Sequence, residues 1–282
     1  MGILQDASKQ DLKRLLGTFP VAALKDGWSA IKGTKEEICF AAAEERNLGR
    51  IVSFMSKNIG RCKQHVYVFT PPATEKIDAA TAIPDAEIVS TDEGGRSIYV
   101  TRAVFSVFLK DPPEESVVEF LWPIRFEIHH GYFVLSMVVL ERNPCVYYDR
   151  DCFKLSRSID ERGIVKNLEA LGYVRADLHQ GVKKLWDENF MDSCETNYKK
   201  PKSTAREAMD EELGIKQHNP VLYEELQAAT LFRTVFQMDP QSECGVEEFH
   251  VDPSGGYIAF PRYTEGAGDA DYVVHAILEK NN

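Results

Sequence analysis

The residues best placed to do chemistry in this sequence are a set of bases at helical spacing. They are Arg46, Arg50, Lys57 and Arg61. A helix is predicted from Lys35 to about Asn58, and at about 100° per residue the four bases fall within roughly 60° of one another if that helix continues to Arg61. The apolar residues of that segment fall on the opposite side, so one face is predicted to be basic and the other buried. Such a basic face neutralises phosphates or an acidic protein surface, and the simpler alternative is a solvated helix face.

The charge distribution along the chain supports a local basic surface. Residues 1–65 carry eleven bases and seven acids, a net charge of +4, whereas the whole chain has a formal net charge of -11. The remainder therefore carries -15, which argues against a surface built throughout to coat nucleic acid or anionic lipid. Lys32 and Lys35, near the start of the predicted helix, extend the basic surface.

A second group of residues has the types and spacing of metal ligands. Glu248, His250 and Asp252 alternate with apolar residues, so a strand would project them from one face. Glu127 and His129 repeat the same spacing on another predicted strand. Imidazole and carboxylates together bind zinc, manganese or iron, which makes a metal-dependent hydrolase or nuclease the alternative function. An outward polar face of a sheet gives the same pattern without any metal.

Sequence motifs typical of other active sites are not matched, because the residues do not have the spacing that those motifs require. The glycines of 27–35 do not form a P-loop, and residues 206–214 have one residue too many for a Nudix box. No G-x-S-x-G motif occurs, and the polar aromatic cluster at 147–151 is better explained as a surface loop. The sequence therefore nominates no catalytic residue and predicts no cofactor, and it favours a protein that is not an enzyme.

One short segment has a family-like pattern. Residues 23–38, which run through Gly33, Thr34 and Lys35, resemble the helix, loop and helix start of the DNA-binding SAP motif. The likeness covers fewer than twenty residues, and the loop from Trp28 to Gly33 is shorter than in that family. No family is assigned on this resemblance.

The elements that must position these residues are predicted from hydrophobic periodicity. Residues 1–62 follow the helical period, with Ser8 as an N-cap and with Thr34 and Glu37 as a capping box. The remaining elements are expected as strands at about 65–70, 87–90, 97–110, 116–130 and 132–142, helices at 157–171, 177–191, 203–213 and 220–229, and strands at 231–238, 246–252, 256–262 and 271–279.

This order predicts an α+β protein with a mainly antiparallel sheet and an inserted helical segment. We expect a basic helical domain at 1–64 and an α+β body at 65–282, with strands over 65–142, helices over 156–229 and strands over 230–280.

The cysteines and the targeting signals of a sequence indicate the cellular compartment in which the protein is expected. Six scattered cysteines with no C-x-x-C pair predict reduced, mostly buried thiols. No secretory signal and no membrane-spanning run is recognisable, so a cytoplasmic or nuclear protein that is not secreted is expected.

The sequence thus favours a binding or adaptor protein. Its basic helical domain would contact nucleic acid or an acidic protein, and its body would provide a scaffold, a protein partner's surface or self-association within a larger complex. No membrane partner is expected.

Overall fold

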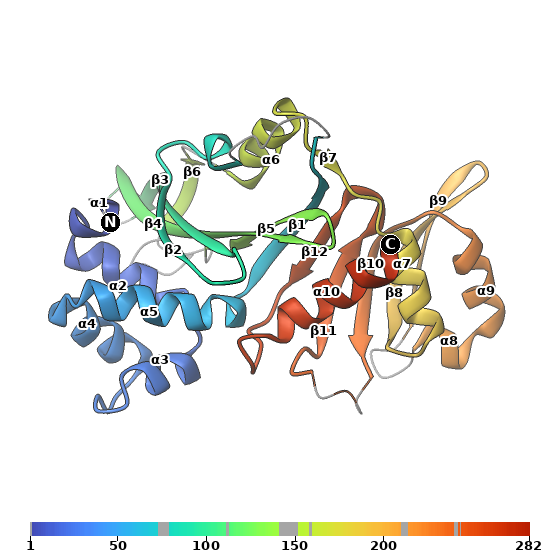
Figure 1. Cartoon of the computed structure of the whole chain (residues 1–282), viewed down its shortest axis with the longest axis horizontal. Helices are drawn as coiled ribbons and strands as arrows, with labels where there is room; N and C mark the ends of the chain where they lie inside the picture. The colour runs from blue at the N-terminus through green and yellow to red at the C-terminus, as the bar shows by residue number, and fades with distance from the viewer. Residues whose placement is uncertain are drawn as a thin grey trace. The chain divides into compact units, whose positions relative to one another are not determined.

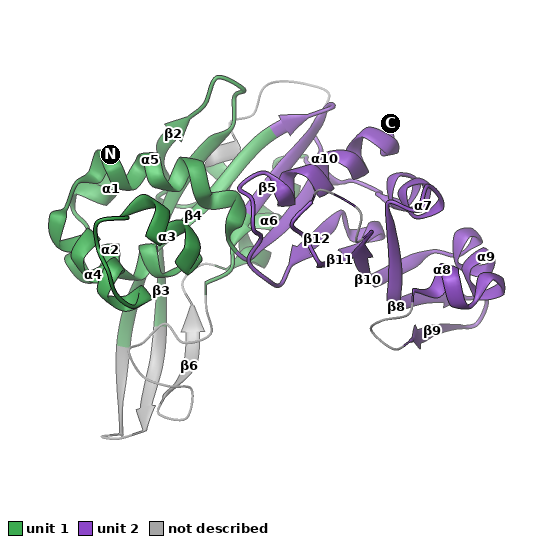
Figure 2. Ribbon diagram, turned by 90° about the horizontal axis from the view of Figure 1, so that it is seen from below, with its two compact units in different colours: residues 1–62, 74–127, 137–172 green, residues 63–73, 128–136, 173–282 purple. Residues whose placement is uncertain are grey.

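A computed structural model of the chain describes residues 2–72, 79–110, 113–140, 152–157, 160–209, 214–239, 242 and 244–282. The chain divides into two compact units, each assembled from three separate stretches of sequence (Figure 2). Unit 1 comprises residues 1–62, 74–127 and 137–172, and unit 2 comprises residues 63–73, 128–136 and 173–282. A separate domain at 1–64 remains a prediction.

Residues 2–61 of unit 1 form helices joined by short connections, as predicted. The helices are α1 Gly2–Gln5, α2 Lys9–Gly17, α3 Val21–Gly27, α4 Lys35–Glu45 and α5 Leu48–Asn58, followed by the 3-10 turn η1 Ile59–Arg61. Both predicted caps are confirmed, because Ser8 and Thr34 each accept a hydrogen bond from the backbone three residues on. Local side-chain chemistry therefore sets where α2 and α4 begin.

The strands of unit 1 centre on one long strand. β3 Ser97–Lys110 pairs antiparallel with β2 Glu87–Thr91, with β4 Pro113–His129 and with β6 Cys152–Arg157. The 3-10 turn η2 Ala79–Ala82 and helix α6 Glu161–Ala170 complete the unit. The predicted turn between β3 and β4 falls on residues 111 and 112, outside the described part of the chain, as does the cluster at 147–151.

A single core joins the helices of unit 1 to its strands. Leu12, Leu16 and Met55 are fully buried, and the same cluster contains Val100 and Leu121 of the strands. The N-terminal helices therefore bury their apolar faces against residues that lie far along the sequence.

Unit 2 is built around an antiparallel sheet. Its strand order is β1-β12-β11-β10-β8-β9, with β7 also paired to β1 and β5 beside β1. The strands are β1 Gln64–Thr70, β5 Tyr132–Val138, β7 Val174–Arg175, β8 Met191–Lys200, β9 Ser203–Ala208, β10 Leu231–Met238, β11 Glu248–Asp252 and β12 Tyr257–Phe260. The helices are α7 His179–Asp187, α8 Ile215–His218, α9 Pro220–Ala228 and α10 Asp269–Asn281, with the 3-10 turn η3 Pro253–Gly255.

Helices α7 and α10 cover one face of this sheet, and they lie in front of the strands in Figure 1. Alternate residues of β1 and β12, among them Val66, Val68 and Ile258, share a buried core with Val182 of α7 and Ile277 of α10. The intervening residues of the same strands therefore point to the opposite face.

Two elements predicted after residue 62 have the wrong type. Residues 203–208 form strand β9 in a hairpin with β8, where a helix over 203–213 was expected, and residues 210–213 lie outside the described structure. Residues 271–279 belong to helix α10 where a strand was expected. The run of β-branched residues favours a strand, but the buried positions of α10, which include Ala270, Val274 and Leu278, follow the helical period.

The predicted α+β class and the mainly antiparallel sheet are confirmed. The turn at 253–256 is confirmed as the connection between paired strands β11 and β12. None of the helices in the described ranges has the length and hydrophobicity that crossing a bilayer requires. Of the cysteines with described side chains, Cys39, Cys62 and Cys194 are buried free thiols and Cys244 is half-buried, as expected.

Candidate functional site

The long helix predicted from Lys35 to Asn58 is broken in the middle, so that prediction is wrong. Arg46 adopts a left-handed conformation with φ 51°, which ends α4, and the Asn47 side chain accepts from the Arg50 N–H at 3.1 Å to begin α5. Asparagine is a strong N-cap residue, and the two short helices bury separate apolar faces. The angular argument that placed Arg46 beside Arg50 on one helix face therefore does not hold.

The Arg46 side chain forms hydrogen bonds within unit 1. Its guanidinium donates to the carbonyl oxygens of Gln5 at 2.8 Å and Ala7 at 3.0 Å. These bonds attach the turn between α4 and α5 to the connection between α1 and α2. The Arg46 guanidinium is therefore engaged by backbone carbonyl oxygens of unit 1.

Arg50 also makes contacts within unit 1. It donates to the Gly27 carbonyl oxygen at 2.8 Å, forms an ion pair with Glu45 at 3.1 Å, and lies 5.2 Å from the centre of the Trp28 ring. A guanidinium over an indole face is a favourable cation–π geometry. Arg50 therefore holds α5 against the end of α3.

Arg61 and Lys57 continue the basic side of α5 toward the same segment. Arg61 lies 3.5 Å from the exposed Asp26 carboxylate, and only 15% of its own side chain is exposed. Lys57 is exposed and has no interaction partner in the described structure. It stands about two turns after Arg50 and about one turn before Arg61, so the three bases follow one side of the chain.

Two further lysines lie nearby, Lys25 in the last turn of α3 and Lys32 in the loop between α3 and α4. Lys25 and Lys32 line a hollow of about 300 Å³ together with Ser29, Ile31 and Gly33. No carboxylate lines it, and within the described ranges neither lysine has a partner. Lys35, at the start of α4, is half-buried and does have one.

We call Lys25, Lys32, Arg50, Lys57 and Arg61 the basic cluster. Its five positive charges are accompanied by two acids that contact it, Asp26 and Glu45. The sequence predicted four of the five residues and missed Lys25. The signal for Lys25 was its place in the last turn of a helix that ends at Gly27, where a basic side chain is favoured.

The candidate metal ligands of β11 do share a face, as the alternation predicted. Glu248, His250 and Asp252 are all partly exposed. His250 Nε2 lies 3.3 Å from Glu248 Oε1, whereas Asp252 Oδ1 accepts from the Gly255 N–H at 3.1 Å and caps η3. Asp252 therefore stabilises the turn between β11 and β12.

The other two candidate ligands have different partners. Glu127 is buried and pairs with Arg96 at 3.1 Å, and His129 stacks on His275 with ring centres 3.6 Å apart. Across the described ranges, no three His, Cys, Asp or Glu side chains are grouped so that they could hold a metal ion. The five predicted ligands are thus not brought together in one site.

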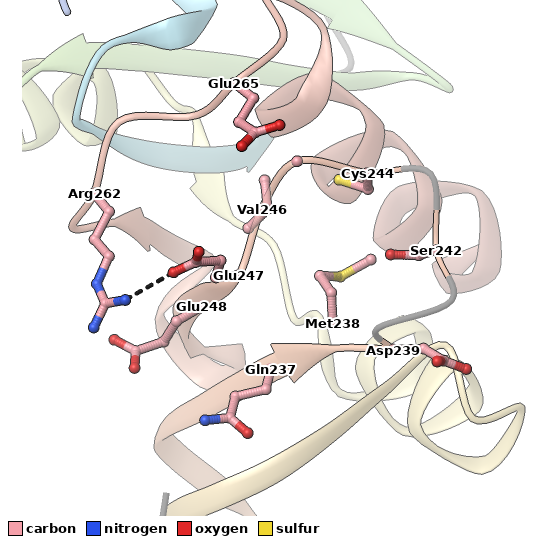
Figure 3. A pocket seen from close by; sticks show the side chains of 11 residues that line it. Gln237, Met238, Asp239, Ser242, Cys244, Val246, Glu247, Glu248, Arg262 and Glu265 are labelled. Atoms are coloured by element: carbon pink, nitrogen blue, oxygen red, sulfur yellow. Dashed lines mark hydrogen bonds and ion pairs between the residues drawn. The ribbon is translucent and has the colours of Figure 1, made fainter. Parts of the chain in front are cut away.

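Glu248 also lines a separate hollow in unit 2, of about 460 Å³ (Figure 3). Carboxylates dominate its charged lining, with Asp239, Glu247 and Glu265 beside Glu248. The one base in the lining, Arg262, is paired with Glu247 at 2.9 Å. The hollow is therefore acidic, the opposite of the basic cluster.

An acid, a histidine and a serine also occur near one another at the start of β10. His179 Nδ1 lies 2.5 Å from Asp177, its Nε2 contacts the backbone N–H and carbonyl of Leu231, and Ser254 donates to that same carbonyl at 3.0 Å. Because the Leu231 backbone occupies Nε2, the imidazole is not placed to take a proton from Ser254. These contacts fasten β10 to α7 and η3.

The chain matches no known family model, no curated protein and no solved structure.

Proposed function

We propose that this is a non-enzymatic binding protein whose helical segment contacts nucleic acid through the basic cluster. The remainder of the chain is proposed to act as a scaffold or second interaction surface within a larger complex. Each base acts by neutralising a phosphate charge and releasing its counterions.

The observation that carries the proposal is that three exposed lysines have no interaction partner among the described residues. In residues 2–62 most bases have a partner, such as Lys9 with Glu44 and Lys13 with Glu36. Lys25, Lys32 and Lys57 are exposed and have none among the described residues. Exposed ammonium groups that have no carboxylate partner are available to an anionic ligand.

The test is fluorescence anisotropy with labelled duplex DNA, single-stranded DNA and RNA, at about 50 and 200 mM salt. Lys25→Glu/Lys32→Glu is expected to weaken binding by about tenfold or more and to reduce the salt slope by roughly two. The matched control is Lys199→Glu/Lys202→Glu, which makes the same charge change at exposed positions near the hairpin of β8 and β9.

Equal effects of the two double variants would contradict the basic cluster, because only the net charge would then matter. Failure of the wild-type chain to bind any of the three probes would contradict nucleic acid as the partner. An acidic protein surface would then be the ligand to test.

A further inference from the structure

The face of unit 2 that lies opposite α7 and α10 carries a row of aromatic rings. His65 and Tyr67 of β1 and Tyr257 of β12 are each partly exposed. The Tyr257 ring lies 5.5 Å from His65 and 5.0 Å from Tyr67, measured between ring centres. The strand register explains this contact, because Tyr67 is directly opposite Tyr257.

Cations lie over Tyr67 of this row and over Tyr263, which follows β12 in the chain. The Arg175 guanidinium lies 5.8 Å from the centre of the Tyr67 ring, and Lys63 Nζ lies 5.0 Å from the centre of the Tyr263 ring. Arg175 reaches its position because β7 pairs with β1. Residue 63 directly precedes β1, and an extended chain from residue 63 to residue 67 spans about 13 Å.

We infer that this surface, formed by Lys63, His65, Tyr67, Arg175, Tyr257 and Tyr263, is a stacking platform for single-stranded nucleic acid. Partly exposed aromatic rings can stack with unpaired bases, and the flanking cations neutralise the phosphates between those bases. A duplex keeps its bases stacked inside and presents no free base face, so it does not use this platform.

Charges on the neighbouring strand are compatible with this partner. Asp252 of β11 lies directly opposite Tyr257, and Glu248 shares its face of the strand, but Asp252 caps Gly255 and Glu248 faces His250. Lys63 and Arg175 lie directly over rings of the platform. A ligand that joins aromatic bases through anionic linkages matches this combination better than an uncharged sugar polymer.

Cross-strand aromatic pairs also stabilise sheets without binding anything. In unit 2, the extent of burial distinguishes rings that pack within the fold from rings that can bind a ligand. Phe69, Phe133 and Tyr173 form a neighbouring aromatic group that is buried and has a purely packing role. The rings of the platform remain partly exposed beside it.

The inference rests on nucleic acid being the partner and adds a second surface to the basic cluster. The probes are a fluorescein-labelled oligothymidylate of about 15 nucleotides and a duplex of the same length. Tyr67→Leu/Tyr257→Leu is expected to weaken oligothymidylate binding by roughly tenfold or more, with the salt slope and duplex affinity unchanged. Tyr67→Phe/Tyr257→Phe keeps the rings and is expected to bind within about twofold of wild type.

Tyr272→Leu, at an exposed tyrosine of α10, is the matched control and is expected to bind as wild type. Wild-type affinity of the Leu double variant would overturn the inference, as would loss of binding in the Phe variant. If Lys25→Glu/Lys32→Glu binds as wild type while the Tyr67→Leu/Tyr257→Leu variant does not, the basic cluster fails and the platform stands.

A measurement on the unmodified chain covers the case in which the Leu variant does not fold. Ultraviolet cross-linking of wild-type protein to oligothymidylate, followed by peptide mapping, is expected to mark peptides that contain Tyr67 or Tyr257. Cross-links confined to other peptides, or no cross-linked product, would overturn the inference.

Discussion

The Arg50 guanidinium donates a 2.8 Å hydrogen bond to the Gly27 carbonyl oxygen and lies over the neighbouring Trp28 ring. This relationship joins α5 to the C-terminal end of α3, where free carbonyl groups favour a cation. Part of the basic cluster therefore stabilises the fold, and the cluster divides into bases that hold the helices together and bases that are open to a ligand.

Replacement of Arg50 by Ala is expected to lower the free energy of unfolding by about 1 to 2 kcal/mol. The loss comes from the hydrogen bond to Gly27 and the cation–π contact with Trp28. Urea unfolding followed by tryptophan fluorescence measures it. Lys57→Ala, at an exposed base with no partner in the described structure, is the control and is expected to stay within about 0.5 kcal/mol of wild type. Equal losses for both variants would show that the contacts of Arg50 contribute nothing.

Gly181→Ala is expected to destabilise the protein although alanine is the better helix former. A Cβ at Gly181 of α7 would overlap the Ile277 carbonyl oxygen of α10, and backbone cannot move aside as a flexible side chain can. Overpacking of this kind costs about 1 to 3 kcal/mol. Thermal unfolding checks the prediction against Gly17→Ala at the end of α2, where the new Cβ meets nothing within 4 Å. A Tm for Gly181→Ala equal to or above that of wild type would contradict the close approach of the two helices.

The Asp177 carboxyl is expected to contribute a pH-dependent part of the stability. Burial raises its pKa, but hydrogen bonds from the His179 backbone N–H and imidazole outweigh burial, so the pKa lies below its ordinary value. A depressed carboxyl pKa stabilises the fold above the unfolded-state pKa of about 4, and that stability is lost as the pH falls through the folded-state pKa. The Tm difference between wild type and Asp177→Asn should therefore shrink below about pH 4. A difference that stays constant between about pH 6 and pH 3 would contradict the assignment.

Thiol reactivity is expected to follow burial among the cysteines with described side chains. Burial raises the pKa of Cys39 to about 11, partly offset by the charges of Lys35 and Lys13, and it raises the pKa of fully buried Cys62 as well. The thiolate is the reactive form, so both should resist alkylation in the native protein, and half-buried Cys244 should react first. Mass spectrometry after timed treatment with N-ethylmaleimide measures the order. Cys62 reacting as fast as Cys244 would mean that the core of unit 1 opens readily.

The sequence predicted best where neighbouring residues decide the structure. The caps at Ser8 and Thr34 depend on side chains three residues away, and both are present. The break at Arg46 was missed because the packing of α4 and α5 on distant strands decides it, although Asn47 was a visible cap residue. Helix α10 was missed because a run such as Val273 to Ile277 suits a strand as well as a helix.

In the candidate site too, some features follow from the local sequence and others depend on distant residues. The types and positions of Lys32 and Lys57 were enough to nominate them. No spacing rule separates Arg46, which donates to the carbonyl oxygens of Gln5 and Ala7, from a base that faces solvent. That distinction needs the tertiary contacts. The ring row of Tyr67 and Tyr257 depends on the pairing of β1 with β12, whose residues are about 190 apart in the sequence.

The interleaving of the two units has a consequence for synthesis of the protein on the ribosome. The core that buries Leu12, Leu16 and Met55 also contains Val138, so the N-terminal helices cannot complete it when they emerge. At 5 to 20 residues per second, roughly 4 to 15 s separate translation of residue 62 from that of residue 138. During that interval the apolar faces of α2, α4 and α5 lack their strands, and the nascent chain is a substrate for chaperones that hold exposed hydrophobic segments.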